Sequence, residues 1–83
     1  MKVDLFKILK ENNYEIENSN SNGLNISFND NEVAIKGDKT YLIELANYIV
    51  NIALSDNEKD HIHIDELTLI DKDSEIKNII IEK

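Results

Sequence analysis

Hydrophobic residues recur along the chain with two different periods, which predict helices in some segments and strands in others. Residues 4–11 place Leu5, Ile8 and Leu9 on one face of a short helix. Asp4 can cap the start of this helix by accepting a backbone hydrogen bond. A helix this short needs packing against the rest of the fold to persist.

A longer helix is predicted to start with Asp38 or Thr40 as its cap and to end near Leu54. It carries an apolar stripe at helical spacing, made of Leu42, Leu45, Ala46, Ile49, Ile52 and Ala53. Further apolar residues flank the stripe, namely Tyr41, Ile43, Tyr48, Val50 and Leu54. We expect the first helix to cover the flanking residues. The alternative is that they form an interface with a partner.

Strict alternation of apolar and polar residues predicts a β-hairpin. Leu24, Ile26 and Phe28 alternate on one side of the polar segment 29–31, and Val33 and Ile35 resume the alternation on the other. The segment contains Asn and Asp, which tolerate the positive φ angles of a tight turn. This is the clearest hairpin in the chain.

Three further segments are predicted to be strands. Residues 14–17 favour a short edge strand, and residues 61–64 alternate as a strand. Residues 76–82 form the strongest strand, in which the run Ile79-Ile80-Ile81 indicates burial on both faces. Residues 67–70 are ambiguous between a turn and a strand.

This order of elements predicts a single α+β domain over residues 1–83. We expect a mainly antiparallel sheet of four to five strands. The short N-terminal helix and the one long helix would pack on one face of that sheet.

Composition narrows the range of partners. The net charge is −8, and all nine basic residues are lysine, which argues against nucleic acid and anionic membranes as partners. The charge favours a basic protein partner, although acidity also serves solubility alone. There is no cysteine, and no apolar run approaches the ~20 residues of a membrane span. We expect a cytoplasmic protein.

The segment from Asp60 to Glu66 contains the only two histidines. On a strand, His61, His63 and Asp65 would point to one side, as three zinc ligands must. However, His61 and Asp65 would lie roughly 13 Å apart on a straight strand, too far to share one ion. We therefore predict no metal or cofactor and favour a role in surface recognition.

Other residues do not assemble a catalytic pattern. Ser55 and Ser74 lack a local base that would activate their hydroxyls. The two glycines form no phosphate-binding loop. The acidic pairs at 65–66 and 71–73 lie in charged segments, where strongly shifted pKa values are not expected. The sequence thus predicts a protein that is not an enzyme.

The order of segments from Leu24 to Lys83 resembles the immunity protein 32-type family of bacterial polymorphic toxin systems. The resemblance rests on Glu32-Val-Ala-Ile-Lys-Gly-Asp38, the apolar helix, His61-Ile-His-Ile-Asp65, Asp73-Ser74 and Ile79-Ile-Ile-Glu-Lys83. It implies a small intracellular protein that binds and neutralises a cognate toxin without catalysis, with the histidine stretch as the first candidate for contact.

We therefore predict a cytoplasmic immunity protein that occludes the surface of its toxin. The predicted partner-binding residues are His61, His63, Asp65, Glu66, Tyr41 and Tyr48. The two tyrosines are potential interface anchors, and packing in the core is an equally good interpretation of them. Two alternatives remain: a small metal-binding protein or metal-dependent enzyme that uses His61 and His63, and a self-associating structural domain that forms a homodimer.

Overall fold

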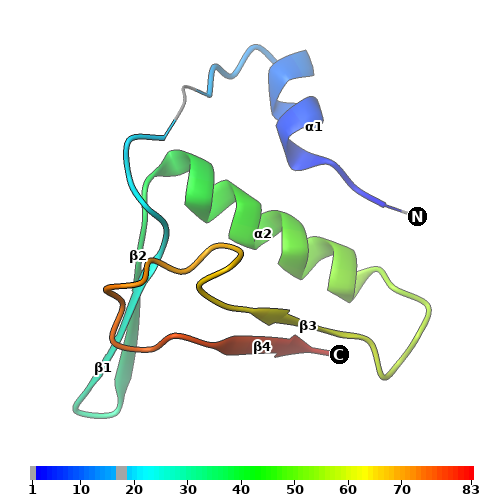
Figure 1. Cartoon of the computed structure of the whole chain (residues 1–83). Helices are drawn as coiled ribbons and strands as arrows, with labels where there is room; N and C mark the ends of the chain where they lie inside the picture. Colours follow the sequence, from blue (N-terminus) through cyan, green and yellow to red (C-terminus); the bar gives the residue numbers. More distant parts are fainter. Residues whose placement is uncertain (1, 17–18) are drawn as a thin grey trace.

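The computed structural model describes residues 2–16 and 19–83 (Figure 1). In this part of the chain the elements are α1 (Leu5–Glu11), β1 (Asn25–Asn29), β2 (Glu32–Lys36), α2 (Lys39–Ala53), β3 (His61–Ile64) and β4 (Ile79–Glu82). The predicted α+β class is confirmed. Neither described helix is long and apolar enough to cross a membrane.

The four described strands form two separate antiparallel sheets, so the prediction of one sheet with four to five strands is wrong. β1 pairs with β2, and β3 pairs with β4. A single parallel bridge between Leu24 and Ile70 links the two halves. The edge strand predicted near the N-terminus does not form at residues 14–16, while residue 17 lies outside the described residues.

The first hairpin forms where the alternation predicts it. Its register runs from Asn25 opposite Lys36 to Asn29 opposite Glu32, which leaves a two-residue turn. The turn residues Asp30 and Asn31 have φ angles of 49° and 67°. Positive φ at both central positions matches the right-handed twist of a β-hairpin, and Asp and Asn tolerate it best after glycine.

The connection between β3 and β4 occupies the edge of β1 that a third strand would otherwise take. The Leu24 amide donates to the Leu69 carbonyl at 2.7 Å, and the Asp71 amide donates to the Leu24 carbonyl at 2.9 Å. A Cβ atom on Gly23, whose φ is 133°, would lie 2.6 Å from the Leu69 oxygen. The approach of these two backbones thus requires glycine at this position.

Ser74, in the same connection, binds the backbone of β1 through its side chain. Its buried hydroxyl accepts a hydrogen bond from the Ile26 amide at 2.8 Å. The same hydroxyl lies 3.1 Å from the Ile26 carbonyl and 2.7 Å from the Ile76 carbonyl, either of which can accept its proton. Because Ser74 replaces a strand residue here, the backbone groups of β1 are satisfied without a continuous sheet.

The core lies where α2 and the two hairpins meet. Its buried hydrophobic residues are Leu24, Ile26, Leu45, Ile64, Leu69 and Ile70. Of the stripe predicted on α2, Leu45 alone is buried, whereas Leu42 and Ile49 are 41% and 44% exposed. Two narrow hairpins cover less of a helix than one broad sheet, so only one line of α2 residues reaches the core.

Two residues that flank the predicted stripe pack against the core, although most of the stripe does not. Tyr41 and Tyr48 are half-buried against the core, so α2 turns this side toward the hairpins. Tyr48 also lines a groove together with Phe6 of α1. Leu54 stays 55% exposed at the end of α2.

The N-terminal segment is fastened to α2 by asparagine side chains. Asn47 Oδ1 accepts a hydrogen bond from the Leu5 amide at 3.0 Å. Asn51 accepts from the Val3 amide at 2.6 Å and donates to the Val3 carbonyl at 2.8 Å. The polar side of α2 thus holds α1 in place by hydrogen bonds.

The predicted burial of β4 on both faces is also wrong. Ile79 and Ile81 are half-buried on the side facing the core, whereas Ile80 points the other way and is 50% exposed. A two-stranded sheet with a helix on one side leaves its second face uncovered. The strand begins at Ile79, three residues later than predicted.

Of the two predicted caps, Asp38 is the residue that caps the start of α2. Its side chain accepts a hydrogen bond from the Tyr41 amide at 3.0 Å, and the Ser19 hydroxyl donates to its second oxygen. These bonds, that of Ser19 first and that of Tyr41 second, hold the pKa of Asp38 below its ordinary value of 3.8. Both stabilise the ionised carboxylate.

We expect Ser74→Ala to lower the free energy of unfolding by about 1–3 kcal/mol, because it leaves the buried Ile26 amide without an acceptor. Urea denaturation measures the change. Ser27→Ala, on the exposed part of β1, is the matched control and should change stability by less than about 0.5 kcal/mol. Equal losses in both variants would contradict a special role for Ser74.

We expect Ser19→Ala to raise the pKa of Asp38 toward its ordinary value, which an NMR pH titration of the Asp38 carboxyl measures. Because the folded-state pKa is depressed, Asp38 stabilises the fold above about pH 4 and loses this contribution as the pH falls through the folded-state pKa. Ser27→Ala should leave the titration of Asp38 unchanged. An unchanged midpoint in Ser19→Ala would show that the serine does not determine the pKa.

Candidate functional site

The hairpin of β3 and β4 has one face toward the core and one toward solvent. Ile62 and Ile81 are opposite each other on the inner face, as are Ile64 and Ile79. The outer face carries two pairs, His61 opposite Glu82 and His63 opposite Ile80. All four of these outer residues are exposed, and we call them the open face.

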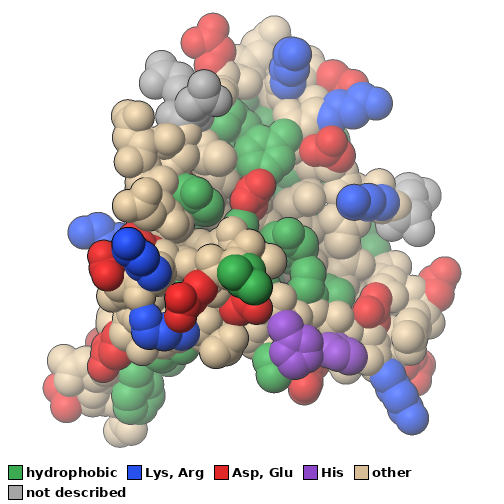
Figure 2. Space-filling model, viewed as in Figure 1, with side chains coloured by type: hydrophobic (Ala, Val, Ile, Leu, Met, Phe, Trp, Pro, Cys, Tyr) green, Lys and Arg blue, Asp and Glu red, His purple; other side chains and the backbone are tan. Residues whose placement is uncertain are grey.

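The two histidines contact each other on the open face. Their ring centroids are 5.2 Å apart and the rings are nearly perpendicular, at 80°. His61 Nδ1 also lies 3.3 Å from the Lys59 carbonyl oxygen. Figure 2 shows both imidazoles on the surface, with hydrophobic and acidic side chains beside them. The alternation of the sequence correctly predicted that the histidines share one face.

Asp65, predicted to contact a partner, shapes the turn that follows β3. Its Oδ1 accepts a hydrogen bond from the Leu67 amide at 2.9 Å, and its own amide donates to Thr68 Oγ1 at 2.9 Å. Its carbonyl oxygen accepts from the amides of Thr68 and Ile70 at 3.1 and 3.0 Å. Local hydrogen bonds of this kind fix a turn without help from other elements.

This turn displays two side chains directly after the open face. Glu66 forms an ion pair with Lys77 at 3.7 Å, and both side chains remain about half exposed. Leu67 is 94% exposed, the highest value among the large hydrophobic residues described. Alternation could have indicated Ile80 and Glu82 as site residues, because the pairing partner of a histidine shares its face. Nothing in the local sequence marks Leu67 as exposed.

The arrangement does not favour a metal centre. Within residues 2–16 and 19–83, no group of three or more His, Cys, Asp or Glu side chains is close enough to hold a metal ion. The Asp65 carboxylate, which the metal-binding alternative would need as a third ligand, accepts a hydrogen bond from the Leu67 amide in the turn. Two imidazoles alone supply fewer ligands than a structural or catalytic zinc site needs.

Tyr41 and Tyr48, the other predicted anchors, lie on α2 and are half-buried against the core. They are not part of the open face, which belongs to β3 and β4. Tyr48 also borders a groove between the N-terminal segment and the end of α2. Four acidic residues line this groove, namely Asp4, Glu44, Asp56 and Asp60, with Lys2 beside them. The groove offers an acidic surface next to β3.

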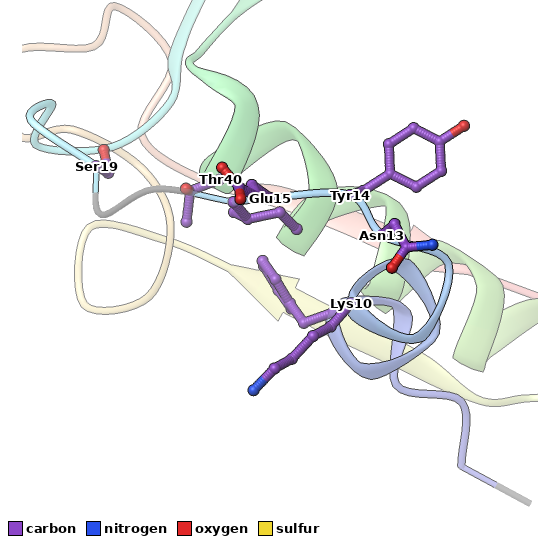
Figure 3. A pocket seen from close by; sticks show the side chains of 8 residues that line it. Lys10, Asn13, Tyr14, Glu15, Ser19 and Thr40 are labelled. Atoms are coloured by element: carbon purple, nitrogen blue, oxygen red, sulfur yellow. The ribbon is translucent and has the colours of Figure 1, made fainter.

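A second pocket lies between α1 and the start of α2 (Figure 3). Among its lining residues, Glu15 and Thr40 lie near the start of α2, Ser19 lies on the preceding loop, and the Tyr14 ring points away from all three (Figure 3). The described residues that line it include one lysine and one glutamate but no histidine. No described histidine lies beside the Ser19 or Thr40 hydroxyl to act as its base, so we assign no chemistry to the pocket.

Comparison with known protein families identifies a relationship. The sequence model of the family described as Immunity protein 32 matches residues 32–83, which is more than half of the chain. The match begins at β2 and includes α2, the turn after β3 and the whole open face. No curated protein and no solved structure matches the chain.

We expect Tyr48→Ala to lower the free energy of unfolding by about 1–3 kcal/mol, because it removes a half-buried ring packed on the core. Thermal or urea denaturation measures the loss. Tyr14→Ala is the matched control, since Tyr14 is 64% exposed, and should cost less than about 0.5 kcal/mol. A Tyr48 variant as stable as the control would assign the ring to a binding surface rather than to the core.

Proposed function

The chain belongs to the immunity protein 32 family, and on this premise we propose that it binds and neutralises a cognate protein toxin in the cytoplasm. Neutralisation proceeds by occlusion, without catalysis: the bound protein covers the surface with which the toxin acts. The match to the immunity protein 32 family supports binding as the mechanism.

The open face is the surface that we assign to toxin contact. One observation carries this assignment: Ile80 is half exposed in the middle of a sheet face that no other described element covers. An apolar residue surrounded by His61, His63 and Glu82 resembles the usual anatomy of an interface, in which an apolar centre lies within a polar rim.

The turn after β3 extends this contact surface. Glu66 and Leu67 are assigned to direct contact, and Asp65 holds the turn in the shape that displays them. An interface of ~800 Å² on each partner is enough for tight binding if a few anchors fill matching pockets. Leu67 and Ile80 are the apolar anchors in this proposal. Tyr41 and Tyr48 contribute indirectly, by packing beneath the hairpin.

We propose that the toxin is basic. The chain carries a net charge of −8, and the acidic groove lies between the N-terminal segment and α2, next to β3. Opposite charge accelerates encounter and excludes partners of like charge. The same charge disfavours nucleic acid as a partner, since phosphate groups would be repelled.

The proposal is tested by purifying the tagged protein from its own bacterium and identifying bound proteins by mass spectrometry. We expect one toxin to co-purify in stoichiometric amount. With that toxin, Ile80→Ala and the double variant His61→Ala/His63→Ala should each weaken binding roughly tenfold or more, as hot-spot residues do. Titration calorimetry measures the affinities.

Ile8→Ala is the matched control, because Ile8 on α1 is 44% exposed, close to the 50% of Ile80. It should leave the affinity unchanged. If the toxin binds but the Ile80 and histidine variants bind as tightly as the wild type, the open face is the wrong surface. If no toxin co-purifies although it is expressed, the immunity function itself is wrong.

A further inference from the structure

β2 has one edge with which no other described strand pairs. Along β1, Leu24 and Ile26 direct their backbone groups away from β2, toward the connection that contains Leu69 and Ser74. In an antiparallel pair, residues that are directly opposite point their backbone groups the same way relative to the ladder. Ile35 is opposite Ile26 and Val33 is opposite Phe28, so the amides and carbonyls of Val33 and Ile35 point outward.

No other described element covers this edge. All five residues of β2 are exposed, with Val33 at 60% and Ile35 at 43%. Among the described residues, the backbone hydrogen bonds outside the helices and strands involve none from residues 32–36. A short, exposed edge strand with apolar residues is a template for pairing with another strand. On the same face of the ribbon, Phe28 is 54% exposed.

The sequence of β2 is complementary to itself when it runs antiparallel to a second copy. With Ala34 on a two-fold axis, Val33 is opposite Ile35 of the other copy, and Glu32 is opposite Lys36. Val33 and Ile35 are the two residues whose backbone groups point outward, so each such pair exchanges two hydrogen bonds. Opposite charges at directly opposed positions add stability to a sheet.

We propose that the protein forms a two-fold symmetric homodimer in which the β2 edges of two copies pair. The two ribbons become one four-stranded antiparallel sheet in the order β1, β2, β2, β1. Each row across its apolar face then holds Phe28, Val33, Ile35 and Ile26, the last two from the other copy. We assign a second copy to this edge because Glu32 and Lys36 of one copy are then opposite residues of opposite charge in the other. This inference does not depend on toxin binding.

The test measures the dimer dissociation constant of the full chain alone by sedimentation across the micromolar range. Glu32→Lys places like charges opposite each other at both ends of the strand, and we expect it to weaken the dimer roughly tenfold. The dimer is expected to weaken although Glu32→Lys brings the net charge of the chain from −8 to −6, which reduces repulsion between whole molecules. The swap Glu32→Lys/Lys36→Glu should restore the wild-type dissociation constant.

Val33→Pro is a second variant that acts on the edge alone, because the amide that it removes points away from β1. We expect it to abolish the dimer while circular dichroism stays that of the wild type. Ile80→Ala, on the open face, should dimerise normally. A wild-type chain that is monomeric throughout the micromolar range would overturn the proposal. So would a charge swap that fails to restore a dimer weakened by Glu32→Lys.

Discussion

The contact between Ser74 and Ile26 is the interaction that the rest of the structure depends on. It joins the two halves of the chain at the centre of the core, where the β3–β4 connection passes along β1. The Ser74 hydroxyl accepts a hydrogen bond from the Ile26 amide, and the Ile26 carbonyl accepts one from the Ile76 amide. Ser74 and Ile76 thus replace the hydrogen bonds that a neighbouring strand would make to Ile26. Without the Ser74 hydroxyl, a buried amide would have no acceptor.

This contact also explains why the strands remain in two pairs. The connection covers the inner edge of β1 through a bridge at Leu24 and a side chain at Ile26, and then turns toward β4. A continuous strand at this position would have fused the hairpins into one broad sheet. Two narrow hairpins instead share α2, and each keeps a surface that no described element covers (Figure 1).

These two uncovered surfaces divide the proposed binding between them. The open face on β3 and β4 presents side chains, namely the histidines and Ile80, which suits recognition of a shaped protein surface. The edge of β2 presents backbone groups, which suits pairing with a strand. The two surfaces lie on different hairpins, so a dimer formed through β2 can present an open face on each copy.

The sequence by itself determined the class, the helices, the first hairpin and the family. These follow from short-range patterns: alternation in residues 24–35, the caps at Asp4 and Asp38, and the shared face of the two histidines. Periodicity reports which residues lie on the same side of an element. It therefore correctly grouped residues on one side of a helix or strand, because the local backbone alone determines that grouping.

Only the tertiary structure decided which of those sides is buried. The stripe on α2 was expected in the core, yet Leu42 and Ile49 are exposed while Tyr41 and Tyr48 pack inward. Ile80 was expected to be buried, and it is exposed because its sheet has two strands and one covered face. Burial depends on how many strands lie beneath a helix. This number follows from the contact between Ile26 and Ser74, which are 48 positions apart, and short-range patterns do not report such a contact.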